Sequence, residues 1–242
     1  MEQHKFWIPV LLFLCSFSAH AQMVEVLSGT GFYVSPDGYV ITNEHVVQNC
    51  KSIRLKSTDE TVDAVLKAVD KENDLALLEA NKKPYYIATM RYEQNLRPDD
   101  EVTVIGFPAE NGRADQYRMR TAKIIDTKGP MGQAGWLQFT QALQHGNSGG
   151  PLLDQFGNVI GVVRGRVSFV RIEYRELSDG TRQELSRGAE QASDIAINLP
   201  ILTNFLQANF VNYSNMLNFQ PLTDIQKFEQ GQRYIVNVQC IQ

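Results

Sequence analysis

Turn residues divide this chain into many short segments of β type, and this feature limits its fold more than any other. Residues 31–34 and 39–42 are rich in aromatic and β-branched side chains and flank a Ser-Pro-Asp-Gly turn, a pattern typical of a β-hairpin. Further runs of this type lie at residues 52–55, 61–69, 75–78, 102–106, 122–126, 136–140 and 159–163. Short strands at regular spacing predict barrels or a sandwich and argue against a fold of alternating strands and helices.

Three segments depart from this pattern. The clearest helix candidate begins at Pro200 and covers residues 201–210, and proline suits the first position of a helix. Residues 165–193 are polar and rich in arginine, which predicts an extended hairpin or loop inserted between two strands. Within the tail (211–242), residues 234–241 alternate as a strand does, and we expect this strand to dock on the body.

The first 21 residues have the character of a targeting segment. Lys5 precedes an apolar stretch at residues 6–17, and the small residues Ala19 and Ala21 suit cleavage before Gln22. The alternative is a membrane anchor, but the apolar stretch is short for a span. We therefore predict a signal peptide at 1–21 and an exported mature chain at 22–242, either periplasmic or extracellular, with no membrane span in its body.

Composition excludes several other functions. The net charge of −4 shows no basic excess, so a nucleic-acid role is not expected. Signal cleavage leaves Cys50 and Cys240, which suggest one disulfide in an exported chain, with two buried free thiols as the alternative. The chain has no Cys-x-x-Cys pair and no histidine cluster, so neither a metal site nor a cofactor is expected.

The segment at residues 146–151, Gly-Asn-Ser-Gly-Gly-Pro, carries the most chemical information. It places Ser148 in a tight turn where glycines allow close backbone approach and let successive N–H groups point to one spot. Fixed donors of this kind stabilise a developing oxyanion. A serine becomes an effective nucleophile only with a base in reach and a group that orients that base.

Few residues are suited to these two roles. Only His45 and His145 remain after signal cleavage, and His145 is too near Ser148 in sequence to reach it well, so His45 is the better base. Asp74 lies directly before the apolar run at 75–78, the setting expected of a buried orienting carboxylate. Each feature alone is common in proteins without catalytic function, whereas the order His–Asp–Ser in these contexts is specific.

Several segments together resemble the chymotrypsin-like serine peptidases, and most closely the HtrA (DegP-type) branch. Residues 41–47 read Ile-Thr-Asn-Glu-His-Val-Val, residues 73–78 read Asn-Asp-Leu-Ala-Leu-Leu, and residues 146–152 continue the serine turn into Pro-Leu. The Gly-Thr-Gly-Phe at 29–32 and the Ile-Ala-Ile-Asn-Leu-Pro at 195–200 are similar to further segments of that branch.

The resemblance spans about residues 28–210 and implies a fold. It implies an all-β chain of two packed six-stranded antiparallel barrels, one at about 25–107 and one at about 115–200. A helix at about 200–210 and the tail at 211–242 would follow.

The same resemblance implies a reaction. Peptide bonds would be hydrolysed through an acyl-enzyme on Ser148, with His45 as general base and Asp74 orienting it. The backbone N–H groups of Gly146 and Ser148 would form the oxyanion hole.

The chain also departs from the family pattern. Digestive members carry Asp in place of Asn147, so activation by insertion of a new N-terminus is not expected here. The residues after Pro200 are too few for the PDZ domain that usually follows in HtrA proteins, so we expect a peptidase domain without PDZ. The short stretch before the first barrel favours a monomer.

The resemblance also indicates which residues contact the substrate, a protein or peptide. Ala142, Leu143 and Gln144 would line the primary pocket, together with Arg164, Gly165 and Asp194 from two later strands. No acid lies at the pocket floor, which favours a small or medium apolar side chain before the cleaved bond, whereas Asp194 would instead select a basic one. Arg164 and Arg166 either favour acidic substrate neighbours or are simply solvated.

An exported serine endopeptidase is therefore the leading hypothesis. The alternative is a non-proteolytic or latent protein of the same fold with a binding or chaperone-like role. A third hypothesis is a peptidase that an activating partner switches on.

Overall fold

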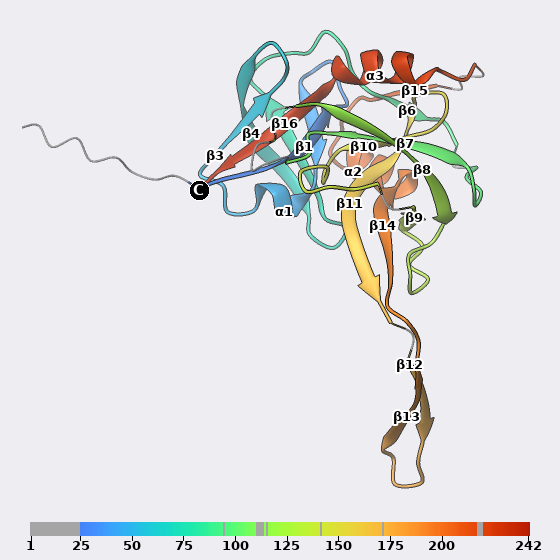
Figure 1. Ribbon diagram of the computed structural model, residues 1–242. Helices are drawn as coiled ribbons and strands as arrows, with labels where there is room; N and C mark the ends of the chain where they lie inside the picture. Colours follow the sequence, from blue (N-terminus) through green and yellow to red (C-terminus); the bar gives the residue numbers. More distant parts are fainter. Residues whose placement is uncertain are drawn as a thin grey trace, which may run out of the picture.

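The computed structural model describes residues 25–242 except 94, 110–113, 115, 141, 171 and 217–219. The predicted signal peptide lies outside the described residues. Two β-barrels pack side by side (Figure 1), which confirms the predicted fold class.

The first barrel is closed by six strands in the order β1-β16-β3-β4-β5-β2. Its strands are β1 (Val26–Tyr33), β2 (Tyr39–Thr42), β3 (Ser52–Lys56), β4 (Thr61–Asp70), β5 (Leu75–Ala80) and β16 (Ile235–Ile241). The side chains of β5 are buried at every position except Glu79, which is partly buried. A strand buried on both faces has the continuous apolar sequence seen here.

The second barrel is also a ring of six strands. They are β7 (Glu101–Gly106), β8 (Arg118–Asp126), β9 (Trp136–Phe139), β10 (Pro151–Leu153), β11 (Val159–Phe169) and β14 (Gln191–Asn198). The ring closes because β10 pairs with both β7 and β11. Two short strands, β6 (Thr89–Arg91) and β15 (Ser214–Met216), extend the sheet from β11 in parallel.

The predicted boundary between the barrels was wrong at residues 101–106. These residues were placed in the first barrel, whereas β7 pairs with β8 and β10 of the second. Val102 and Val104 are buried in the core of the second barrel, which explains the assignment. The place left in the first barrel is filled by β16 from the tail, whose Val236 and Val238 join the core of that barrel.

The helices are short. They are α1 (Glu44–Val47), α2 (Leu199–Ala208) and α3 (Asp224–Gln232). The predicted helix at Pro200 is confirmed as α2, which begins one residue earlier, where the Asn198 side chain accepts a hydrogen bond from Ile201 N at 3.2 Å. Among the described residues, no helix has the length and apolar character needed to cross a bilayer.

The predicted insertion is confirmed as a hairpin, but it is shorter than residues 165–193, because 165–169 belong to β11 and 191–193 belong to β14 of the second barrel. β12 (Ile172–Glu176) and β13 (Arg182–Arg187) form a separate two-stranded sheet between β11 and β14. Figure 1 shows this hairpin standing away from both barrels. We call residues 170–190 the arm.

Candidate active site

The short helix after β2 and the turn before β5 bring His45 and Asp74 together. His45 lies on α1, directly after β2, and Asp74 lies directly before β5, which pairs with β2. His45 Nδ1 lies 2.9 Å from Asp74 Oδ2 and 3.0 Å from Oδ1, and His45 N donates to Oδ1 at 3.1 Å. The His45 side chain is 47% exposed and that of Asp74 is 9% exposed, so the pair has one buried and one accessible member.

The backbone around Asp74 is fixed in an uncommon conformation. Asp74 has a φ of 58°, in the left-handed region. Its carbonyl accepts hydrogen bonds from Asn43 Nδ2 at 2.8 Å and from Glu44 N at 3.3 Å. These bonds tie the Asp74 loop to the start of α1, so the carboxylate and the imidazole keep their relative position.

The pKa of Asp74 lies below its usual value. Burial by itself raises this pKa, but the hydrogen bonds from the His45 side chain and backbone, with the His45 and Arg164 charges, outweigh burial. Asp74 is therefore a carboxylate at neutral pH, and it accepts hydrogen bonds from its neighbours.

Ser148 comes from the second barrel and meets the first barrel at β1. Its carbonyl accepts a hydrogen bond from Thr30 N at 2.8 Å, and Thr30 Oγ1 donates to Gly146 O at 2.6 Å. The turn requires glycine at two positions. Gly146 (φ +94°) and Gly149 (φ +84°) lie in the left-handed region, and a Cβ at either would collide with backbone oxygen, that of Phe107 or that of Thr30.

The same turn presents two backbone donors. Among the described residues, neither the Gly146 nor the Ser148 N–H donates a hydrogen bond, whereas Asn147, Gly149 and Gly150 all do. Both N–H groups therefore have no acceptor among the described residues, and both belong to the turn that carries the Ser148 hydroxyl.

Arg164 joins the two halves of the site. Ser148 Oγ donates to the Arg164 carbonyl at 3.1 Å, and among the described residues no hydrogen bond connects Ser148 with His45. The Arg164 side chain, which is 28% exposed, reaches across to the first barrel, where its Nε donates to Asp74 Oδ2 at 3.2 Å. The sequence placed Arg164 among the substrate-contacting residues and missed this contact with Asp74.

The remaining predicted contact residues form a second group. The Asp194 carboxylate, whose side chain has no exposed area, accepts hydrogen bonds from Ala142 N at 2.6 Å and Leu143 N at 2.7 Å. Arg166 Nε donates to it at 2.8 Å. Buried and fully engaged, Asp194 has no surface with which to select a basic substrate residue, and Arg166 is an ion-pair partner rather than a purely solvated side chain.

The other two predicted contact residues flank these groups. The Gln144 side chain accepts a hydrogen bond from Arg120 Nη2 at 3.2 Å. Gly165 follows Arg164 on β11 and pairs with Ile195. Residues that the sequence did not single out, Thr30, Asn43 and Trp136, also support the site. These three residues are recognised by their proximity to the site in the folded chain, and a single sequence does not show this proximity.

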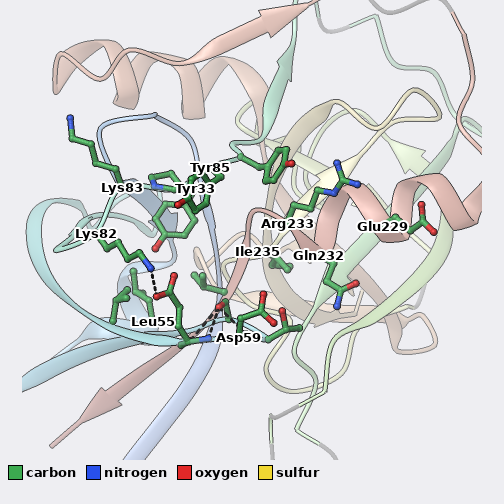
Figure 2. A pocket seen from close by; sticks show the side chains of 17 residues that line it. Tyr33, Leu55, Asp59, Lys82, Lys83, Tyr85, Glu229, Gln232, Arg233 and Ile235 are labelled. Atoms are coloured by element: carbon green, nitrogen blue, oxygen red, sulfur yellow. Dashed lines mark hydrogen bonds and ion pairs between the residues drawn. The ribbon is translucent and has the colours of Figure 1, made fainter.

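A pocket of about 580 Å³ lies away from these residues, at one end of the first barrel. Figure 2 shows its lining, which includes Tyr33, Lys82, Tyr85 and Arg233. Lys82 is ion-paired with Glu60, and burial together with the Glu60 charge raises the pKa of Tyr33 to about 12. The pocket has neither His45 nor Ser148 in its lining. Among the described residues, no three His, Cys, Asp or Glu side chains are grouped to hold a metal ion.

Several known proteins have sequences similar to that of this chain. Serine protease HTRA1B of Danio rerio is 32% identical over 179 residues, which cover 69% of this chain and 36% of the relative. A probable periplasmic serine endoprotease, DegP-like, of Bartonella henselae is 35% identical over 140 residues, covering 55% and 27%. The chain thus spans about a third of the length of these curated relatives.

Solved structures show the same fold. The HtrA-type protease AlgW with decapeptide aligns with a TM-score of 0.58 at 24% identity, over 75% of this chain and 51% of that one.

A family model for the trypsin-like peptidase domain matches residues 29–162, which include His45, Asp74 and Ser148. Because this match covers more than half of the chain, the protein belongs to the trypsin-like peptidase family, with HtrA and DegP proteins among its relatives.

Proposed function

We propose that this chain is a serine endopeptidase that cleaves peptide bonds through an acyl-enzyme on Ser148. The observation that carries the proposal is the convergence of the His45–Asp74 pair with a serine turn that has two unengaged N–H groups. These are the groups that acyl transfer requires: a base, a group that orients the base, a nucleophile and oxyanion donors.

Each residue has a defined role in this reaction. Asp74 holds His45 Nδ1, so Nε2 is the ring nitrogen left to accept the Ser148 proton. The Ser148 oxygen then attacks the substrate carbonyl carbon, and the resulting oxyanion accepts hydrogen bonds from the Gly146 and Ser148 N–H groups. Protonated His45 gives its proton to the leaving amine as the peptide C–N bond breaks.

Water completes the cycle. His45 takes a proton from a water molecule, and the water oxygen attacks the acyl carbon. The ester bond breaks, the proton returns to Ser148, and the carboxylic acid product leaves. Before the attack, Ser148 Oγ has to leave the Arg164 carbonyl, to which it donates at 3.1 Å, and turn toward His45.

We further propose that the chain is exported and acts on proteins or peptides. Support comes from the signal-like residues 1–21, from the periplasmic description of the DegP-like relative and from the decapeptide bound to AlgW. Cys50 and Cys240, whose Cα atoms lie 5.2 Å apart, are proposed to form a disulfide, which suits an oxidising compartment. A monomer remains our prediction for the oligomeric state.

A latent or binding protein is the second candidate function. One observation favours it: the Ser148 hydroxyl is engaged by the Arg164 carbonyl rather than by His45. In such a protein, a partner would have to release the hydroxyl before catalysis.

Reaction of the mature protein (22–242) with a fluorophosphonate, followed by peptide mapping, separates the two candidates. A peptidase labels at Ser148, and labelling is lost in His45→Ala. Ser148→Ala is expected to abolish hydrolysis of an unfolded protein substrate with little loss of stability, because Ser148 lies in a turn, is only partly buried and loses one hydrogen bond of its hydroxyl. Folded wild-type protein that fails to label would favour the latent or binding function, and cleavage by Ser148→Ala would disprove the nucleophile assignment.

A further inference from the structure

The backbone at Arg164 has an irregularity that directs the side chain toward the first barrel. The register between β11 and β14 shifts between Val163 and Gly165, so Arg164 is the extra residue of a β-bulge. Bulges redirect a side chain at the rim of a barrel. Here the guanidinium crosses from the second barrel to Asp74 of the first, 90 residues earlier in the chain.

An aromatic ring holds the guanidinium from a second side. The central carbon of the Arg164 guanidinium lies 4.5 Å from the centroid of Trp136, the first residue of β9. Stacking on an indole ring favours a cation and limits its motion. Arg164 is therefore a fixed charge, held between a carboxylate and a ring.

This fixed cation shares one carboxylate oxygen with the imidazole. Asp74 Oδ2 lies 2.9 Å from His45 Nδ1 and 3.2 Å from Arg164 Nε. Among the described residues, Arg164 is the one further charged side chain that is ion-paired with Asp74 or His45. Glu44 is the chain neighbour of His45. The Arg164 cation and the His45 ring thus hold the same carboxylate oxygen, so the loss of either partner leaves Asp74 less firmly oriented.

We infer that Arg164 is a positioning residue: held by Trp136, it fixes the orientation of the Asp74 carboxylate and, through it, that of the His45 ring. The inference rests on the proposed function for its catalytic meaning, but the orientation of the ring can be measured whether or not Ser148 reacts.

The first test measures the ring itself at one pH. In the mature chain, His145→Gln leaves His45 as the single histidine, so the Nδ1–H proton that faces Asp74 can be observed by NMR. In this background, Arg164→Gln should broaden or remove this resonance through faster exchange with water, because the carboxylate that holds the proton has lost one of its fixed partners. Arg164→Lys, which keeps the charge, should weaken the resonance less. A resonance that is the same in Arg164→Gln as in the parent protein would overturn the inference.

The second test measures the reaction. In Arg164→Gln the rate of fluorophosphonate labelling at Ser148 should fall by about tenfold, because the base is less well oriented toward the serine. Trp136→Leu should also lower the rate and Trp136→Phe less, since phenylalanine keeps a ring. A lower labelling rate with an unchanged Nδ1–H resonance would make Arg164 a structural residue only. Failure of wild-type protein to label would refute the proposed peptidase activity, whereas the NMR result would still decide the role of Arg164.

Discussion

At the scale of single residues, the site depends on backbone conformations that few side chains tolerate. Asp74 and Gly149 both lie in the left-handed region, one to aim a carboxylate and the other to allow close contact with β1. A residue held in this region is strained unless it is glycine, and its surroundings must compensate. The serine turn and the Asp74 loop are therefore sensitive to substitutions that leave their chemical groups untouched.

Gly149→Ala tests this sensitivity. The added Cβ would meet the Thr30 carbonyl, the Thr42 hydroxyl and the Asn43 N–H, all buried, on a backbone with positive φ. We expect a loss of about 2–4 kcal/mol in the free energy of unfolding, measured by denaturant titration. Gly132→Ala is the matched control, because Gly132 has a φ of +81° but nothing within 4 Å of a Cβ, so it should cost only about 1 kcal/mol. Equal losses in the two variants would show that backbone strain alone decides the cost.

The Arg166–Asp194 pair leads to a prediction about specificity. Arg166 Nη2 donates to Leu143 O at 3.2 Å, and its side chain is 45% exposed, so a positive charge borders the segment before Ser148. Given the proposed activity, peptides with Lys or Arg before the cleaved bond should be cleaved at least about tenfold more slowly than those with Ala or Glu. Mass spectrometry of a peptide library measures this ratio, and Arg166→Gln should reduce it. A preference for basic residues would contradict this assignment.

At the scale of secondary-structure elements, the arm and the barrels differ in how they are supported. β11 and β14 belong to the second barrel, and both continue outward until Phe169 pairs with Gln191, where the arm begins. Beyond this point β12 pairs only with β13, and an isolated two-stranded sheet is marginally stable in water. The arm is therefore an appendage of a barrel that is already closed.

Replacing the arm (170–190) by Asn-Gly should leave the rest of the protein intact. The dipeptide forms a two-residue turn that suits the Phe169–Gln191 pair. We expect the melting temperature to change by less than about 3 °C and Ser148 labelling to keep its wild-type rate. A large fall in melting temperature would mean that the arm supports the barrels, and a change in labelling alone would mean that it contributes to the site.

At the scale of the whole molecule, the two ends of the described chain close one barrel. β16 lies between β1 and β3, pairing from Val26–Ile241 to Phe32–Ile235 on one side and from Ser52–Ile241 to Lys56–Asn237 on the other. Cys240 on β16 is buried, and its Cα lies 5.2 Å from that of Cys50, just before β3. A covalent link there would join segments 190 residues apart.

Removal of this proposed link should weaken the whole fold. Loop-closure entropy for so long a separation predicts a loss of about 2–5 kcal/mol in unfolding free energy for Cys50→Ala/Cys240→Ala, measured by denaturant titration. Wild-type protein in a thiol reductant should lose stability similarly, and the double variant should be unaffected by the reductant. An intact mass that includes both thiol hydrogens, in protein never exposed to a reductant, would disprove the disulfide.

The sequence by itself determined most of the longer strands, the all-β class and the His–Asp–Ser candidates, whereas it gave no sign of the short strands β6, β10 and β15. These depend on local cues: alternating apolar residues, turn dipeptides and a glycine-flanked serine. Such cues say which residues form a strand but not which strand it pairs with. For that reason residues 101–106 were assigned to the wrong barrel.

Only the tertiary structure decided that β16 completes the first barrel and that Arg164 reaches Asp74. Both depend on pairing between segments far apart in the chain, where register and a single bulge set the direction of a side chain. The backbone groups that make these pairings are the same in every residue, so the sequence near Arg164 carries no sign that its partner is a carboxylate 90 residues away.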